Sequence, residues 1–105
     1  MKTSIKTKLE NLSDRFDEIA ALLSQPEVQS DQNKFRALSQ EYAQITPLVE
    51  CYKKFIDTEE TISSAQEMLN EDDAEIRDMA KEEIAEAKQQ QEQLEHQLQI
   101  LLLPQ

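Results

Sequence analysis

The chain has 105 residues, of which 22 are acidic and 11 basic, and its formal net charge of −11 is the wrong sign for autonomous binding to nucleic acid or to an anionic membrane. Glycine is absent, although average usage predicts about seven, and phosphate-binding loops or strained catalytic turns are therefore not expected. The longest aliphatic run, Ile100 to Leu103, is too short for a membrane span, and no signal peptide is visible, so we expect a cytoplasmic protein.

The first 24 residues carry apolar side chains at steps of three and four, the heptad spacing of a helix that buries one stripe. The members of this stripe are Ile5, Leu9, Leu12, Phe16, Ile19 and Leu23. Thr3 or Ser4 is expected to cap the start, and Pro26 to stop the helix. The spacing predicts a helix over about residues 4–24, followed by a short loop over 26–30.

A second helix is predicted over about residues 31–70, with Ser30 or Asp31 as its cap. Its stripe consists of Phe35, Leu38, Tyr42, Ile45, Val49 and Tyr52, continued by Phe55, Ile62, Ala65 and Leu69. Two interpretations compete at Pro47: Thr46 caps a new helix, or the proline kinks one long helix. Because the stripe keeps its register across Pro47, two nearly collinear segments, in effect one bent rod, are favoured.

The acidic stretch Asn70-Glu71-Asp72-Asp73 predicts a helical hairpin turn, in which Asp72 and Glu75 resemble a capping box. The last helix is expected over 73–102, ending before Pro104. Its stripe consists of Ile76, Ala80, Ile84, Ala87, Leu94, Leu98 and Leu101. Gln91 stands where an apolar residue is expected; it either sets the register or is a tolerated gap, and the gap is favoured.

Short connections make consecutive helices antiparallel neighbours. The expected fold is one all-α domain over residues 1–105, an elongated antiparallel three-helix bundle that tapers to a two-helix coiled-coil-like hairpin. The first helix would pack on the first half of the long rod, and the last helix would run back along its whole length. The oligomeric state cannot be deduced from these patterns.

Helix surfaces of this kind offer no catalytic constellation, so no catalytic residue, metal or cofactor is expected. His96, the one histidine, is predicted to point outward, and Cys51 to be an ordinary thiol. Residues 71–95 hold ten acids against three bases and are interpreted as a solvated surface. The positive concentration of the first helix, which either docks a partner or pairs with acids of neighbouring helices, consists of Lys2, Lys6, Lys8 and Arg15.

Three stretches resemble a known family in their amino-acid sequence. They are Lys34 to Gln44 (KFRALSQEYAQ), Ala65 to Leu69 (AQEML) and Gln93 to Pro104 (QLEHQLQILLLP). They are similar to the amino-terminal helical domain of bacterial peptide chain release factor 1, a class I translation release factor, and the resemblance covers essentially the whole chain. The Leu-Leu-Leu-Pro ending resembles the type that reads UAA and UAG. The resemblance implies that the chain is a truncated part of a longer factor.

In such a factor a Pro-x-Thr element recognises the stop codon and a Gly-Gly-Gln loop triggers peptidyl-tRNA hydrolysis; neither stands in these residues. The resemblance implies that this domain docks to the ribosome at the stalk base of the large subunit, and contacts other domains of the same factor. The alternative is a free-standing helical adaptor or a prefoldin-like chaperone. Gripping tips of such chaperones expose apolar side chains, whereas the tip expected here is Asn70 to Asp73.

Overall fold

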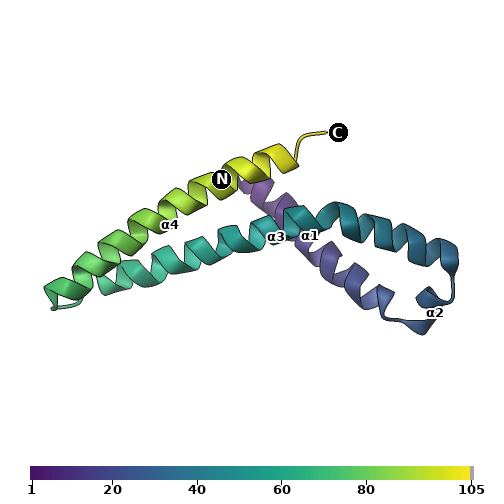
Figure 1. The fold of residues 1–105 in the computed structure, drawn as a ribbon, viewed down its shortest axis with the longest axis horizontal. Helices are drawn as coiled ribbons and strands as arrows, with labels where there is room; N and C mark the ends of the chain where they lie inside the picture. The colour runs from purple at the N-terminus through teal and green to yellow at the C-terminus, as the bar shows by residue number, and fades with distance from the viewer. Residues whose placement is uncertain (105) are drawn as a thin grey trace. The chain divides into compact units, whose positions relative to one another are not determined.

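The computed structural model describes residues 1–104, and over this range it contains four α-helices and no strand. These are α1 (Thr3–Leu23), α2 (Pro26–Gln29), α3 (Gln32–Met68) and α4 (Ala74–Leu101), shown in Figure 1. The all-α class predicted from the sequence is confirmed. The chain divides into two compact units, unit 1 over Met1–Glu50 and unit 2 from Cys51 onward, so that the boundary falls inside α3.

Unit 1 consists of α1, α2 and the first part of α3, which share one apolar core. Its most buried members are Ile19 on α1, Val28 on α2, and Leu38 and Ile45 on α3. The partly buried side chains around them are Leu12, Phe16, Leu22, Leu23 and Tyr42. The rings of Phe16 and Tyr42 stack with their centroids 4.6 Å apart, so the two predicted stripes meet as expected.

The segment after α1 differs from its prediction as a loop, because residues 26–29 form the short helix α2. Pro26 occupies its first position, where the fixed φ of proline suits a helix and the missing N–H costs no hydrogen bond. This turn carries Val28 into the core, where it is only 2% exposed. Burial of an apolar side chain explains why the segment is helical rather than irregular.

The capping residues predicted for the first two long helices are confirmed at α3 but not at α1. Neither Thr3 nor Ser4 caps α1, which begins at Thr3 after Lys2, a residue that makes no side-chain capping bond. Of the two caps proposed for the second helix, Asp31 is the correct one, because its carboxylate accepts a hydrogen bond from the backbone N–H of Lys34 at 3.2 Å.

Helix α3 passes through Pro47 without a break. The hydroxyl of Thr46 donates to the backbone carbonyl of Tyr42 at 2.6 Å, one turn earlier, so Thr46 does not cap a new helix. Proline has no N–H, and the carbonyl of Ala43 therefore lacks its usual helical donor. The interpretation with a helix start at Pro47 is wrong, and one helix contains the proline.

Unit 2 is a helical hairpin of the second part of α3 and the whole of α4, which lie side by side in Figure 1. Its buried residues are Cys51, Tyr52, Phe55, Thr58 and Ala65 on α3, and Ala80, Ala87, Leu94 and Leu98 on α4. The Sγ of Cys51 lies 3.7 Å from the carbonyl oxygen of Leu94, which brings the two helices close at this level. The three buried alanines leave room for such close approach.

Some stripe positions are not buried as expected. Phe35 is 41% exposed, Ile76 36% and Leu101 38%. Ile76 and Leu101 lie in the first and last turns of α4, where a helix has fewer neighbours, and Gln91 is half-buried. A third helix beside the hairpin depends on the placement of one unit against the other and stays a prediction, as does the assignment of one domain.

The turn between α3 and α4 also corrects the predicted cap. Asp73, not Asp72, is the N-cap of α4, and its carboxylate accepts from the backbone N–H of Glu75 at 2.9 Å. No residue among 1–104 has a positive φ, so the connections turn without the left-handed conformation that favours glycine.

Candidate docking site

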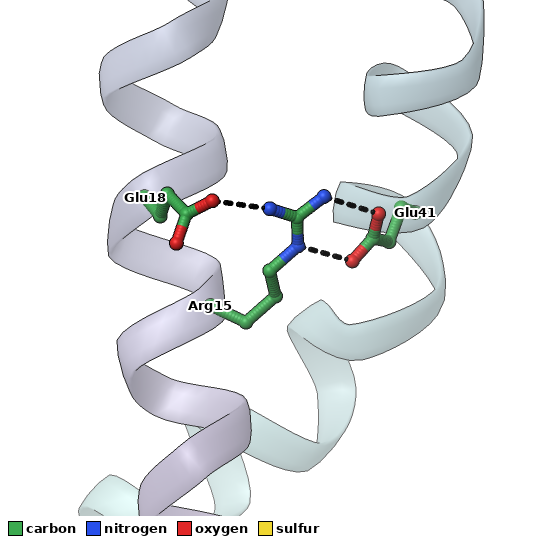
Figure 2. A network of polar contacts seen from close by, with 3 residues as sticks. All are labelled: Arg15, Glu18 and Glu41. Atoms are coloured by element: carbon green, nitrogen blue, oxygen red, sulfur yellow. Dashed lines mark hydrogen bonds and ion pairs between the residues drawn. The ribbon is translucent and has the colours of Figure 1, made fainter.

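Arg15 is the member of the predicted basic group whose environment the structure defines best. It stands on α1 and reaches across to Glu41 on α3, with Glu18 on its other side (Figure 2). Its Nε donates to Glu41 at 2.6 Å and its Nη2 to the other oxygen of the same carboxylate at 2.8 Å. Its Nη1 donates to Glu18 at 2.5 Å. The two hydrogen bonds from Arg15 to Glu41 form a bidentate pair, which is the strongest arrangement of arginine with a carboxylate.

These contacts change the acidity of both partners. The hydrogen bond from Arg15 lowers the pKa of the Glu41 carboxyl, and the same bond raises the pKa of the Arg15 guanidinium. Both side chains remain about one-third exposed, so water screens the interaction. The pairing role that the sequence left open for Arg15 is thus the one that the structure displays within unit 1.

The three lysines of the basic group differ in their exposure. Lys2 and Lys8 are exposed, and Lys6 is half-buried. The Arg15 network includes none of these lysines. The docking role of Lys2, Lys6, Lys8 and Arg15 stays a prediction.

A groove on α2 and α3, which sequence reasoning missed, lies on unit 1. It has a volume of about 510 Å³ and is lined by Gln29 of α2 and, on α3, by Gln32, Phe35, Arg36, Ser39, Gln40 and Ala43. Phe35 is the large apolar side chain of this lining. The α3 members recur at steps of three and four and therefore share one face of the helix. Apart from Phe35, which belongs to the predicted apolar stripe, the α3 members are polar or small, so no hydrophobic periodicity in the sequence marks this groove.

The hairpin turn of unit 2 presents a different surface. The guanidinium of Arg77 donates to the backbone carbonyls of Glu71 and Asp72, both at 2.8 Å, and so fixes the turn before α4. Exposed apolar side chains flank the turn, namely Met68, Ile76 and Met79. From Cys51 onward the sequence holds 14 acidic and 5 basic residues, a net charge of −9, whereas residues 1–50 hold 8 and 6, a net charge of −2.

A comparison with known families accounts for these helices. A family model described as the PCRF domain matches residues 12–105, which leaves out only the first 11 residues. This domain is found in peptide chain release factors. The chain belongs to the PCRF domain family. A release-factor-type function in translation termination, on the ribosome, follows from this membership.

Cys51 and His96 are the remaining residues of this PCRF domain whose side chains could serve as a nucleophile, a base or a metal ligand. Cys51 is buried, and burial raises the pKa of its thiol, which disfavours the reactive thiolate. The thiol donates weakly toward the carbonyl of Leu94 and toward Oε1 of Gln97, both at 3.7 Å. His96 is exposed on α4, as predicted.

Residues 1–104 of the chain contain no group of three or more His, Cys, Asp or Glu side chains arranged to hold a metal ion. Over the same residues, no helix combines the length and the apolar composition that crossing a bilayer requires. The features that distinguish the described surface are therefore the groove at Phe35, the hairpin turn and the acidic surface of unit 2.

Proposed function

We propose that this chain is the ribosome-docking amino-terminal domain of a release factor that terminates translation at UAA and UAG in the cytoplasm. The match to the PCRF domain over residues 12–105 carries the proposal. The finer assignment to UAA and UAG is supported by the resemblance of the ending Leu101-Leu102-Leu103-Pro104 to the factor type that reads these codons.

The helices suit docking better than catalysis. Helix α3 has 37 residues and α4 has 28, lengths of roughly 55 Å and 42 Å at 1.5 Å per residue. Such helices present side chains on a stiff support without loops. We assign no catalytic residue to this chain, and the decoding Pro-x-Thr and catalytic Gly-Gly-Gln elements would be supplied by other domains of the same factor.

The charge of unit 2 indicates the chemistry of its partner. A net charge of −9 repels ribosomal RNA and attracts basic protein surfaces. A ribosomal protein at the stalk base of the large subunit, rather than RNA, is therefore the partner proposed for the hairpin.

The test uses ribosomes stalled at UAA or UAG with labelled formylmethionyl-tRNA in the peptidyl site. The chain alone should release no formylmethionine, but at high concentration it should slow release by an intact factor by competing for the docking site. Release by the chain alone would overturn the docking assignment. A reading frame that lacks Pro-x-Thr and Gly-Gly-Gln after Gln105 would overturn the assignment to a UAA- and UAG-reading factor.

One observation favours the alternative of a prefoldin-like chaperone or helical adaptor. Met68 and Met79, which flank the hairpin turn, are 47% and 69% exposed, so apolar side chains lie nearer the turn than the acidic sequence 70–73 suggests. The chain should then suppress aggregation of an unfolded client protein, measured by light scattering. Suppression that is lost in a Met68→Gln, Met79→Gln variant would support this alternative.

A further inference from the structure

Phe35 is the observation that the proposed function leaves unexplained. The core of unit 1 includes Ile19, Val28, Leu38 and Ile45 but not Phe35, which lies 41% exposed in the 510 Å³ groove. An aromatic side chain in a concave surface is the type of group that anchors protein–protein contacts. We propose that this groove binds a short helical segment of a partner protein that carries a large apolar side chain next to a carboxylate.

The dimensions of the groove favour a helical segment. Its α3 lining runs from Gln32 to Ala43, which is roughly 16 Å of helix at 1.5 Å per residue. Gln29 of α2 adds a residue from a second helix. An amphipathic helix binds a groove of this kind by inserting apolar anchors spaced three and four residues apart.

The positive charge of the groove favours a carboxylate on the partner. Arg36 is the single charged residue of the lining, and among residues 1–104 it has neither an ion pair nor a side-chain hydrogen bond. The lining contains no acid, although the whole chain has a net charge of −11. A partner carboxylate therefore meets an unpaired cation in this groove of unit 1, whereas on unit 2 it would meet mostly like charges.

The polar residues of the lining complete the match. Gln32, Ser39 and Gln40 line the groove, and their amides and hydroxyl can donate to or accept from polar groups of a bound segment. A nucleic acid is disfavoured as occupant, because one arginine offers a single phosphate contact on an acidic protein. The inference goes beyond the proposed function, since it concerns unit 1 and holds whether or not unit 2 docks to the ribosome.

The experiment uses three synthetic 15-residue amphipathic helical peptides, each with leucines at positions i, i+3, i+4 and i+7. Their outer positions are glutamate, glutamine or lysine. Each peptide is titrated into the 15N-labelled chain, and backbone amide shifts are followed by NMR. The glutamate peptide should shift the amides of residues 29–43 and bind roughly tenfold more tightly there than the glutamine peptide.

Two variants test the two anchors. Phe35→Ala should weaken the glutamate peptide roughly tenfold, and Arg36→Glu should weaken it by a similar factor while allowing the lysine peptide to bind at residues 29–43. The matched control is Lys34→Glu, which makes the same charge change at an exposed neighbour outside the lining and should leave binding within about twofold. Circular dichroism verifies that each variant remains folded.

Four results would overturn the inference. The glutamate peptide could leave residues 29–43 unshifted, or the Arg36→Glu and Lys34→Glu variants could behave alike. A single-stranded RNA 12-mer that shifts these amides in an Arg36-dependent way, without any effect of the peptides, would make the groove an RNA contact. Sedimentation showing a dimer that Phe35→Ala dissociates would make it an interface between two copies of the chain.

Discussion

Arg15 and Glu41 tie α1 to α3 through a pair whose strength depends on pH. Because the pKa of Glu41 is lower in the folded chain than its ordinary 4.5, the pair stabilises the fold above about pH 4.5. This contribution is lost as the pH falls through the lowered value.

We expect the melting temperature of Glu41→Gln to lie below that of the wild type at pH 7. The difference should stay constant down to about pH 5 and shrink steadily below pH 4.5. Thermal melts by circular dichroism measure it, with Glu18→Gln as a control in which the two bonds to Glu41 remain. A difference that persists undiminished at pH 2 would contradict the assigned pairing.

The burial of a single side chain could be predicted from the sequence only where another helix lies opposite it. The heptad spacing correctly selects Ile19, Leu38 and Ile45, because it identifies which residues share a helix face. It fails at Phe35, since spacing does not say where along a helix the neighbouring element ends. Thr58 is polar and lies outside the apolar stripes, yet it is buried, and its hydroxyl is satisfied by donating to the carbonyl of Phe55 at 2.6 Å.

At the scale of elements, the start of α4 depends on one capping carboxylate. Asp73→Ala removes the acceptor of the Glu75 N–H and should lower the free energy of unfolding by about 1 kcal/mol. Asp72→Ala removes the same charge one residue earlier and should cost clearly less. Urea denaturation of both variants decides the matter, and equal losses would show that charge near the helix end, rather than the cap, stabilises α4.

Pro47 is a second feature of this scale, because it occupies the interior of α3. Pro47→Ala restores a donor for the carbonyl of Ala43 and should raise the free energy of unfolding by about 1–3 kcal/mol.

Pro26→Ala is the matched control for this substitution. Pro26 occupies the first position of α2, where no hydrogen bond is missing, and its replacement should not stabilise the chain. Calorimetry on both variants gives the comparison. Destabilisation by Pro47→Ala would show that the proline ring contributes packing that outweighs the lost bond.

The three long helices could be predicted from the sequence because each extends over many turns of regular spacing. Helix α2 could not, since its four residues are too few to display a period. Its remaining signals were Pro26 at a helix start and Val28 as an isolated apolar residue. Whether Pro47 interrupts α3 was equally undecidable, because register continues across a kink and across a straight helix alike.

At the scale of the whole molecule, charge is distributed unevenly, with −9 of the net −11 lying from Cys51 onward. Mutual repulsion of these acids opposes folding, and salt screens it. Raising sodium chloride from about 20 mM to about 500 mM should therefore raise the melting temperature by a few degrees.

The triple variant Glu82→Gln, Glu83→Gln, Glu86→Gln provides the control. It should melt at a higher temperature than the wild type in low salt and respond less to added salt, because three of the repelling charges are gone. Melting temperatures that fall with salt would show instead that ion pairs outweigh repulsion.

The candidate docking surfaces show what whole-molecule features a sequence leaves open. The acidity of residues 71–95 can be counted from the sequence, but the lining of the groove at Phe35 combines Gln29 of α2 with residues of α3, and the sequence does not show that these two helices lie together. Concavity is a product of tertiary arrangement, whereas charge is a sum over residues.

The uniformly negative φ angles of residues 1–104 have a practical consequence for mapping the binding energetics of this domain. Alanine is sterically compatible with the backbone at every such position, so an alanine scan introduces no backbone strain anywhere along the described chain. Losses of affinity in such a scan would report side-chain contacts with ribosome or partner, undistorted by hidden conformational penalties.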